Sequence, residues 1–224
     1  MWTVKEALNA FPEKPLEGSQ SPIPYFHLLE RLKTTRREGW KRHGINGESI
    51  ADHSYRMALM AMMAPADLDI NKCIQMCLIH DMAESLVGDI TPADGIPKEE
   101  KEMRERSAID WIANDLLPNV DGGYGEKIQA IWREFEASIT PESRYAQGID
   151  KVELLLQMVE YEKRAEHKTD LSEFTYVETK LRSPQAKKWA EEILEERNRF
   201  WGEEKPVYDQ TGDVKRLQDQ YYGL

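Results

Sequence analysis

Three ionisable side chains stand close together in an apolar stretch, LIHDMAESLVGDI, at residues 78–90. His80, Asp81 and Glu84 lie within five positions of one another, and helical spacing would put His80 and Glu84 one turn apart with Asp81 beside them. Aspartate and glutamate are seldom buried unless they are paired or bound to a cation. The segment therefore predicts either a metal-binding site or a hydrated polar stripe on an amphipathic helix, and spacing alone does not separate the two.

Two residues elsewhere in the chain favour the metal site. His53 lies early in the segment SIADHSYRM, and Asp150 lies in the apolar segment AQGIDKVELLLQMV. Each alone has an ordinary interpretation, as a partly buried histidine and as a solvent-facing aspartate beside Lys151. Together with His80 and Asp81 they offer two imidazoles and two carboxylates, a mixed set that suits a divalent cation such as Mn, Fe, Co, Ni or Zn.

A short basic segment could bind an anionic substrate. Residues 31–43, RLKTTRREGWKRH, contain six Lys or Arg and one acid, Glu38, in a chain whose formal net charge is −11. A solvated helix end explains such a segment equally well. An acidic enzyme that acts on an anion nevertheless needs local positive potential. Trp40, immediately after Gly39, is predicted to lie either in the core or in a pocket.

The elements that must position these residues are predicted to be helices throughout. Apolar residues recur at helical spacing in most of the chain, and Ser49 with Asp52 forms an acidic variant of a capping box at the start of one helix. No convincing β-alternation is present, so we predict a single-domain, all-α helical bundle. The helices are expected at residues 24–37, 50–64, 69–86, 98–118, 126–138, 143–166 and 183–201. Residues 1–20 are expected to form an N-terminal extension, 21–201 the domain, and 202–224 a polar C-terminal tail.

Length and charge exclude several classes of protein. The chain has 224 residues and a pI near 5.1, which suits one sizeable core and argues against a binder of nucleic-acid polymers or anionic membranes. We expect no signal peptide and no membrane span, because the N-terminal residues do not combine a basic region with an apolar stretch and no segment approaches about 18 apolar residues. Its two cysteines, Cys73 and Cys77, are predicted to be buried thiols. We therefore expect an intracellular, cytoplasmic protein.

Several spaced motifs resemble one known family. His53, the doublet His80-Asp81 and the distant Asp150 resemble the H…HD…D signature of HD-domain metal-dependent phosphohydrolases. The stretches LKTTRREGW, ESIADHSYRMALM, HDMAESLVGDITPADGIPKEEK and QGIDKVELLLQMVEYE are similar to its 5'-deoxynucleotidase subgroup, which includes eukaryotic HD-domain proteins. The resemblance covers roughly residues 25–200 and implies an HD-type helical bundle. It also implies a homodimer, whose interface could be formed by exposed apolar surface on the last two helices.

The resemblance implies a role for each matched residue. His53, His80, Asp81 and Asp150 would hold the main divalent cation, which could be Mn, Co, Fe, Ni, Zn or Mg. Glu84 and Asp89 would be catalytic, through proton transfer or by holding a second, weaker ion. The substrate-binding set would be Arg37, Trp40, His53, Asp89 and Thr91. The arginine of this set could also be Arg36, but Arg37 keeps the expected spacing to Trp40.

These roles predict hydrolysis of deoxyribonucleoside 5'-monophosphates to deoxyribonucleoside and phosphate. The physical chemistry agrees, because uncatalysed hydrolysis of a phosphate monoester is very slow and needs both neutralised phosphate oxygens and an activated water. An acid is also needed near the leaving 5'-oxygen, and Glu84 is the best-placed candidate. Two alternatives stay open: another HD-type activity, as a phosphodiesterase or nucleoside triphosphate hydrolase, and a non-catalytic metal-binding interaction module.

Overall fold

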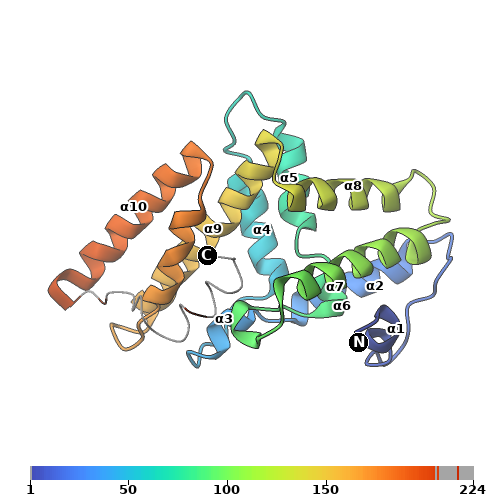
Figure 1. Ribbon diagram of the computed structural model, residues 1–224, viewed down its shortest axis with the longest axis horizontal. Coiled ribbons are helices and arrows are strands. Elements are labelled where there is room, and N and C mark those ends of the chain that lie inside the picture. The colour runs from blue at the N-terminus through green and yellow to red at the C-terminus, as the bar shows by residue number, and fades with distance from the viewer. Residues whose placement is uncertain (1, 205, 207–215, 217–224) are drawn as a thin grey trace. The chain divides into compact units, whose positions relative to one another are not determined.

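A computed structural model describes residues 2–204, 206 and 216, and its regular elements are helices (Figure 1). Within these residues, β pairing is limited to one isolated bridge between Arg36 and Ser49. The all-α prediction is therefore confirmed. The α-helices are α1 (Val4–Leu8), α2 (Ile23–Thr34), α3 (Glu38–Lys41), α4 (Ile50–Ala61), α5 (Ile70–Ile79), α6 (Glu84–Val87), α7 (Lys98–Trp111), α8 (Tyr124–Ala137), α9 (Pro141–Arg164) and α10 (Pro184–Trp201). Shorter elements are η1 (Pro92–Asp94), η2 (Ile112–Leu116), η3 (Ser172–Lys180) and η4 (Gly202–Glu204).

The helices form two compact units. The first unit contains the described residues up to Tyr55 together with Leu78–Glu136. Its core brings α1, α2, α6, α7, η2 and α8 together, and it includes Leu28, Leu86, Ile109 and Trp132. Leu8, in the segment predicted to be an N-terminal extension, is also buried in this core.

The second unit contains Arg56–Cys77 and the described residues from Ala137 onward, with α9 and α10 packed along each other (Figure 1). Gly148 allows the two helices to approach closely, since a Cβ at this position would lie 2.7 Å from the Cβ of Ala186. A buried ion pair also joins them, because the Arg197 guanidinium donates to both carboxylate oxygens of Glu162 at 2.8 Å. Such bidentate pairs are among the stronger polar contacts in proteins.

The predicted capping box at the start of α4 is present. The Ser49 backbone N–H donates to Asp52 Oδ2 at 2.9 Å, and the Asp52 backbone N–H donates to Ser49 Oγ at 3.1 Å. The hydroxyl of Ser49 also donates to Asp52 Oδ2. These bonds fix the beginning of the helix and so place His53 in its first turn.

The predicted helix over residues 69–86 is wrong in one respect that matters for the site. α5 ends at Ile79, and a tight turn separates it from α6, which begins at Glu84. In this turn the Met82 N–H donates to the Ile79 carbonyl, and the Glu84 N–H donates to the Asp81 carbonyl. Bonds between residues three apart are tighter than those of an α-helix. His80 and Asp81 therefore lie in the turn and do not share a helix with Glu84.

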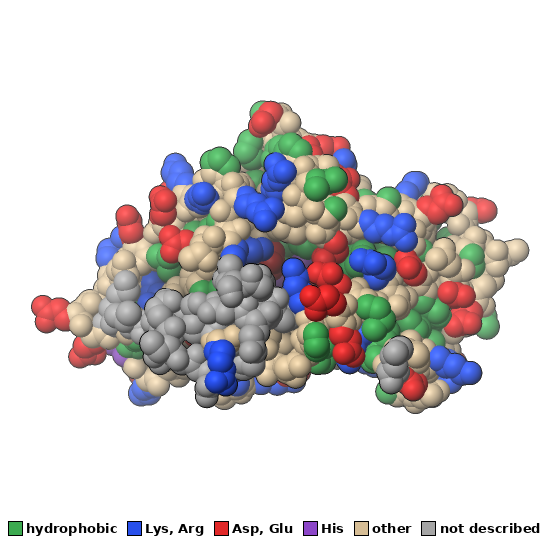
Figure 2. Space-filling model, viewed as in Figure 1, with side chains coloured by type: hydrophobic (Ala, Val, Ile, Leu, Met, Phe, Trp, Pro, Cys, Tyr) green, Lys and Arg blue, Asp and Glu red, His purple; other side chains and the backbone are tan. Residues whose placement is uncertain are grey.

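The described residues expose a mixed surface. Figure 2 shows acidic and basic side chains interspersed with apolar ones on the face that it presents. In the part of the chain that the structure describes, no helix has both the length and the apolar character that crossing a membrane requires. The predicted polar tail, 202–224, falls outside the described residues except at 202–204, 206 and 216, and the domain boundaries stay a prediction.

Candidate metal centre

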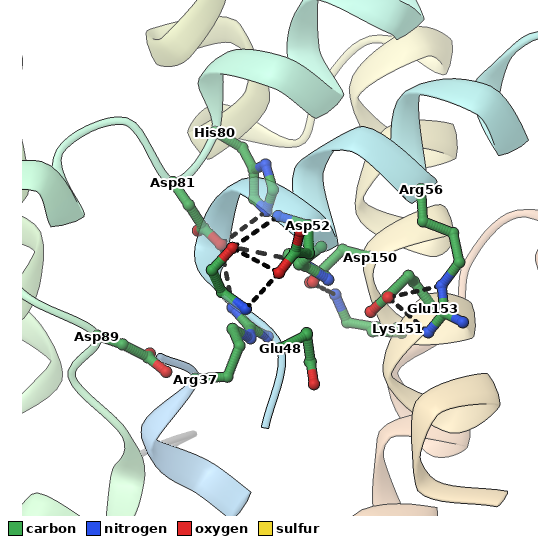
Figure 3. Close-up of polar contacts among 12 residues, drawn as sticks. Arg37, Glu48, Asp52, Arg56, His80, Asp81, Asp89, Asp150, Lys151 and Glu153 are labelled. Atoms are coloured by element: carbon green, nitrogen blue, oxygen red, sulfur yellow. Dashed lines mark hydrogen bonds and ion pairs between the residues drawn. The ribbon is translucent and has the colours of Figure 1, made fainter. Parts of the chain in front are cut away.

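Three of the predicted metal ligands meet within the first unit. His53 comes from the first turn of α4, and His80 and Asp81 come from the turn after α5. Asp81 Oδ2 lies 3.1 Å from His80 Nε2 and 3.9 Å from His53 Nε2, and the two imidazole centroids are 5.4 Å apart. Both histidines are buried. Figure 3 shows Asp81 beside His80. Two buried imidazole nitrogens converging on a carboxylate oxygen are a donor set that suits a divalent cation.

The fourth predicted ligand, Asp150, lies on α9 and pairs with Lys151, whose Nζ is 3.8 Å from Asp150 Oδ2. His53, His80 and Asp150 are a group that could hold a metal ion, because their nitrogen and oxygen donors match the chemistry predicted from the sequence.

The structure distinguishes the two candidate arginines. Arg37 Nη1 donates to Asp81 Oδ2 at 3.0 Å (Figure 3), whereas Arg36 Nη1 donates to the backbone carbonyl of Gly47. Burial alone would raise the pKa of Asp81, but the charges of His80, Arg37 and His53 outweigh it and hold this pKa well below its usual range. Asp81 is therefore a charged carboxylate in a cationic environment, as a metal ligand must be.

Glu84 lies in a different environment. Its side chain is 2% exposed, and its Oε2 accepts no hydrogen bond from the described part of the chain. Burial, reinforced by the negative charges of Asp81 and Asp89, raises the pKa of Glu84 well above its usual value. Two nearby carboxyl groups thus have pKa values pushed in opposite directions. Such a separation is typical of sites where one group stays ionised and the other donates a proton.

Asp89 and Thr91 have identifiable local contacts. Asp89 Oδ2 accepts a hydrogen bond from the Glu38 backbone N–H at 2.7 Å, which ties it to the residue that follows Arg37. Thr91 forms a capping box with Asp94, because its N–H and hydroxyl both donate to Asp94 Oδ2. Asp89 therefore fixes the segment that carries Arg37, and Thr91 fixes the start of η1.

Trp40 is buried in the first unit. Only 2% of it is exposed, and its indole N–H donates to Glu48 Oε1 at 2.9 Å. Gly47 packs against the ring so closely that a Cβ there would lie 2.5 Å from Trp40 Cδ1. Of the two predicted positions for this residue, the structure favours the core.

Sequence reasoning missed a second group of acids. The Glu105 side chain, on the highly charged helix α7, is only 12% exposed, and its Oε1 lies 3.4 Å from Lys101 Nζ. Burial, only partly offset by Lys101, raises the pKa of Glu105 to about 7, and burial likewise raises the pKa of Glu136. The negative charge of Asp81 also contributes to both increases. Little in the sequence indicated this burial, since Lys101 and Glu105 have the i, i+4 spacing of an ordinary surface ion pair.

The chain is similar to several known proteins. The family model for the HD domain matches residues 29–189. The chain is 43% identical to "5'-deoxynucleotidase hdd1" of Schizosaccharomyces pombe, over 82% of this chain and 93% of that protein. It is 37% identical to human "5'-deoxynucleotidase HDDC2", over 81% of this chain and 88% of that protein. The solved structure of "HD domain-containing protein YGK1" superposes with a TM-score of 0.65 at 29% identity, over 88% of this chain and 93% of that one.

Proposed function

The chain belongs to the HD domain family, and we propose that it is a metal-dependent phosphomonoesterase that hydrolyses deoxyribonucleoside 5'-monophosphates to deoxyribonucleoside and phosphate. One observation carries this proposal beyond the names of the relatives. The Asp81 carboxylate faces two buried imidazoles and Arg37, and a neighbouring carboxyl group, Glu84, is buried with a raised pKa. A cation site, an arginine and a protonated acid are the three components that hydrolysis of a phosphate monoester needs.

We assign the ligand role to His53, His80, Asp81 and Asp150, and we propose a divalent cation of the group Mn, Co, Fe, Ni, Zn or Mg. When bound, such a cation supplies positive charge for the phosphate oxygens and a water molecule whose pKa falls from about 15.7 toward about 7. The protein's part is to present two imidazole nitrogens and ionised carboxylates. The lowered pKa of Asp81 keeps that carboxylate ready to bind.

The other residues act on the substrate itself. We propose that Arg37 binds the phosphate, since its guanidinium is already held 3.0 Å from Asp81. Glu84, whose pKa is raised by burial, donates a proton to the leaving 5'-oxygen. Asp89 takes part in proton transfer or holds a second, weaker ion. His53 and Thr91 complete the proposed substrate contacts.

We propose that Trp40 gives the pocket its preference for deoxyribose. An apolar wall penalises a 2'-hydroxyl that loses its hydrogen bonds, by about 1–3 kcal/mol, so the protein should prefer dAMP to AMP roughly 10- to 100-fold in kcat/KM. Trp40→Phe should narrow this ratio, because the smaller ring and the lost bond to Glu48 leave room for a hydrated 2'-hydroxyl. Phenylalanine is preferable to alanine here, since emptying so buried a site costs about 3–5 kcal/mol of stability.

The matched control for this prediction is Arg37→Lys. It weakens the proposed contact with the phosphate, which both nucleotides share, and should lower kcat/KM for dAMP and AMP alike. The measurement is kcat/KM for both substrates in all three proteins. An unchanged dAMP-to-AMP ratio in Trp40→Phe would leave Trp40 with a packing role alone.

One assay distinguishes the proposed activity from another HD-type activity and from a non-catalytic metal-binding module. Purified protein is incubated with dAMP, AMP, dATP and a cyclic nucleotide, with and without a chelator. We expect metal-dependent phosphate release that is fastest from dAMP. Faster turnover of dATP or of the cyclic nucleotide would instead indicate a triphosphate hydrolase or a phosphodiesterase. A metal-binding protein that turned over none of them would be an interaction module, although a structural site needs no acid such as Glu84 beyond its ligands.

We also propose a homodimer formed through the second unit. A groove of about 680 Å³ there is lined by apolar side chains of α4, the turn after it, α9 and α10, including Leu59, Met63 and Trp189. The rim of α10 carries both signs of charge, among them Glu192 and Arg199, so an antiparallel second copy could match opposite charges. Light scattering should give twice the 26.0 kDa of one chain, and a monomer at micromolar concentration would contradict it. The intracellular, cytoplasmic location stays a proposal that rests on the two buried thiols.

A further inference from the structure

The turn that carries His80 and Asp81 is held by a residue outside the proposed ligand set. Trp132, on α8, is 3% exposed, and its indole N–H donates to the backbone carbonyl of His80 at 3.1 Å. Phe135, one helical turn further along α8, places its ring centroid 5.1 Å from that of the His80 imidazole. One face of α8 therefore contacts both the backbone and the ring of a proposed ligand.

The hydrogen bond falls at the point where α5 has ended. Within the turn, backbone N–H groups donate to the carbonyls of Ile79, Asp81 and Met82, whereas the His80 carbonyl accepts the indole N–H. The far side of the turn is fixed separately, because Arg31 Nε donates to the Ser85 carbonyl at 2.6 Å. Trp132 thus restrains the end of the turn from which the ligands project.

We propose that Trp132 is a positioning residue for the metal centre, which fixes the peptide between His80 and Asp81 and thereby the directions of both side chains. The inference rests on the proposed function only in so far as it assumes a metal at this centre. A single peptide plane joins the two residues, so rotation at the His80 carbonyl would move both donor atoms together. Ligand atoms must stay within about 0.2 Å of their ideal distances, and loss of such supporting contacts typically costs 10- to 100-fold in metal affinity.

The test compares two conservative substitutions in the same buried core. Trp132→Phe keeps an aromatic ring and removes the N–H donor. Trp111→Phe is the matched control, since Trp111 is also buried in this core and its indole N–H donates to Glu17 Oε1 at 2.7 Å. Calorimetric titration of each metal-free protein with Mn²⁺ measures affinity without substrate, and thermal unfolding measures the cost in stability. We expect a roughly 10- to 100-fold weaker affinity for Mn²⁺ in Trp132→Phe and wild-type affinity in Trp111→Phe.

Trp132→His is the second variant, because it retains a ring N–H in a smaller and more polar side chain. If Trp132 acts through its hydrogen bond, the histidine variant should bind Mn²⁺ more tightly than the phenylalanine variant even though it packs less well. The opposite order, or equal losses of affinity in Trp132→Phe and Trp111→Phe, would reduce Trp132 to a packing role. Wild-type affinity in Trp132→Phe would overturn the inference and leave the proposed function intact. Failure of the wild-type protein to bind any ion of the group Mn, Co, Fe, Ni, Zn and Mg would overturn both.

Discussion

Asp81→Asn should abolish phosphate release from dAMP, with a loss of roughly 10⁴-fold or more in kcat/KM. Asparagine has nearly the same shape, so the change removes the charge that faces His53, His80 and Arg37 while it leaves the packing in place. A neutral amide is a poor ligand for a divalent cation in a mixed imidazole and carboxylate site. Activity and metal content should therefore fall together.

The same variant should lose stability near neutral pH in the metal-free protein. The charges of His80, Arg37 and His53 hold the pKa of Asp81 well below its usual value of about 4, so its charged form stabilises the folded state above about pH 4, and this contribution is lost on acidification. Asp110→Asn is a suitable control, since Asp110 is a partly exposed aspartate that accepts hydrogen bonds from Gln129 and Arg133. An Asp81→Asn protein that released phosphate at the wild-type rate without metal would contradict the assignment.

Glu84→Gln should retain the metal but slow turnover by roughly 10²- to 10⁴-fold, the usual effect of a lost general acid or base. Burial raises the pKa of Glu84, so it should remain protonated further into the neutral range than an exposed glutamate. Glutamine fills the same space but cannot transfer a proton. The measurements are kcat for dAMP and metal content after purification.

The control for this second prediction is Glu100→Gln on α7, where Glu100 forms an ion pair with Arg104 on the helix surface. It should leave both kcat and metal content unchanged. If Glu84→Gln lost as much metal as Asp81→Asn, Glu84 would be a ligand of the principal ion, and another group would have to protonate the leaving oxygen.

The sequence was sufficient where local chemistry decides the structure. The capping box of Ser49 and Asp52 joins residues three apart, so its pattern predicted the start of α4 and the place of His53. The end of α5 at Ile79 was not predictable in this way. Apolar residues continue at helical spacing beyond Ile79. The end of the helix depends partly on contacts from distant helices, such as the hydrogen bond from Trp132 to the His80 carbonyl.

Burial of charged groups was the other feature that the sequence did not predict. Arg36 and Arg37 are adjacent and chemically identical, and only the fold directs Arg37 to Asp81 and Arg36 to the Gly47 carbonyl. Glu105 has the spacing of a surface ion pair with Lys101, yet tertiary packing buries it and raises its pKa. Local sequence specifies which helix a side chain belongs to, whereas its solvent exposure depends on the other helices packed around it.

Phosphate release from dAMP, before and after removal of metal, tests the central claim most directly. The purified protein is assayed as isolated, after exhaustive chelation, and after Mn²⁺ or Co²⁺ is restored, with Asp81→Asn in parallel. We predict that chelation abolishes phosphate release by the wild-type protein, that restored metal recovers it, and that the variant is inactive in all three states. Undiminished phosphate release by the chelated wild-type protein, or no release in any state, would contradict a metal-dependent deoxynucleotidase.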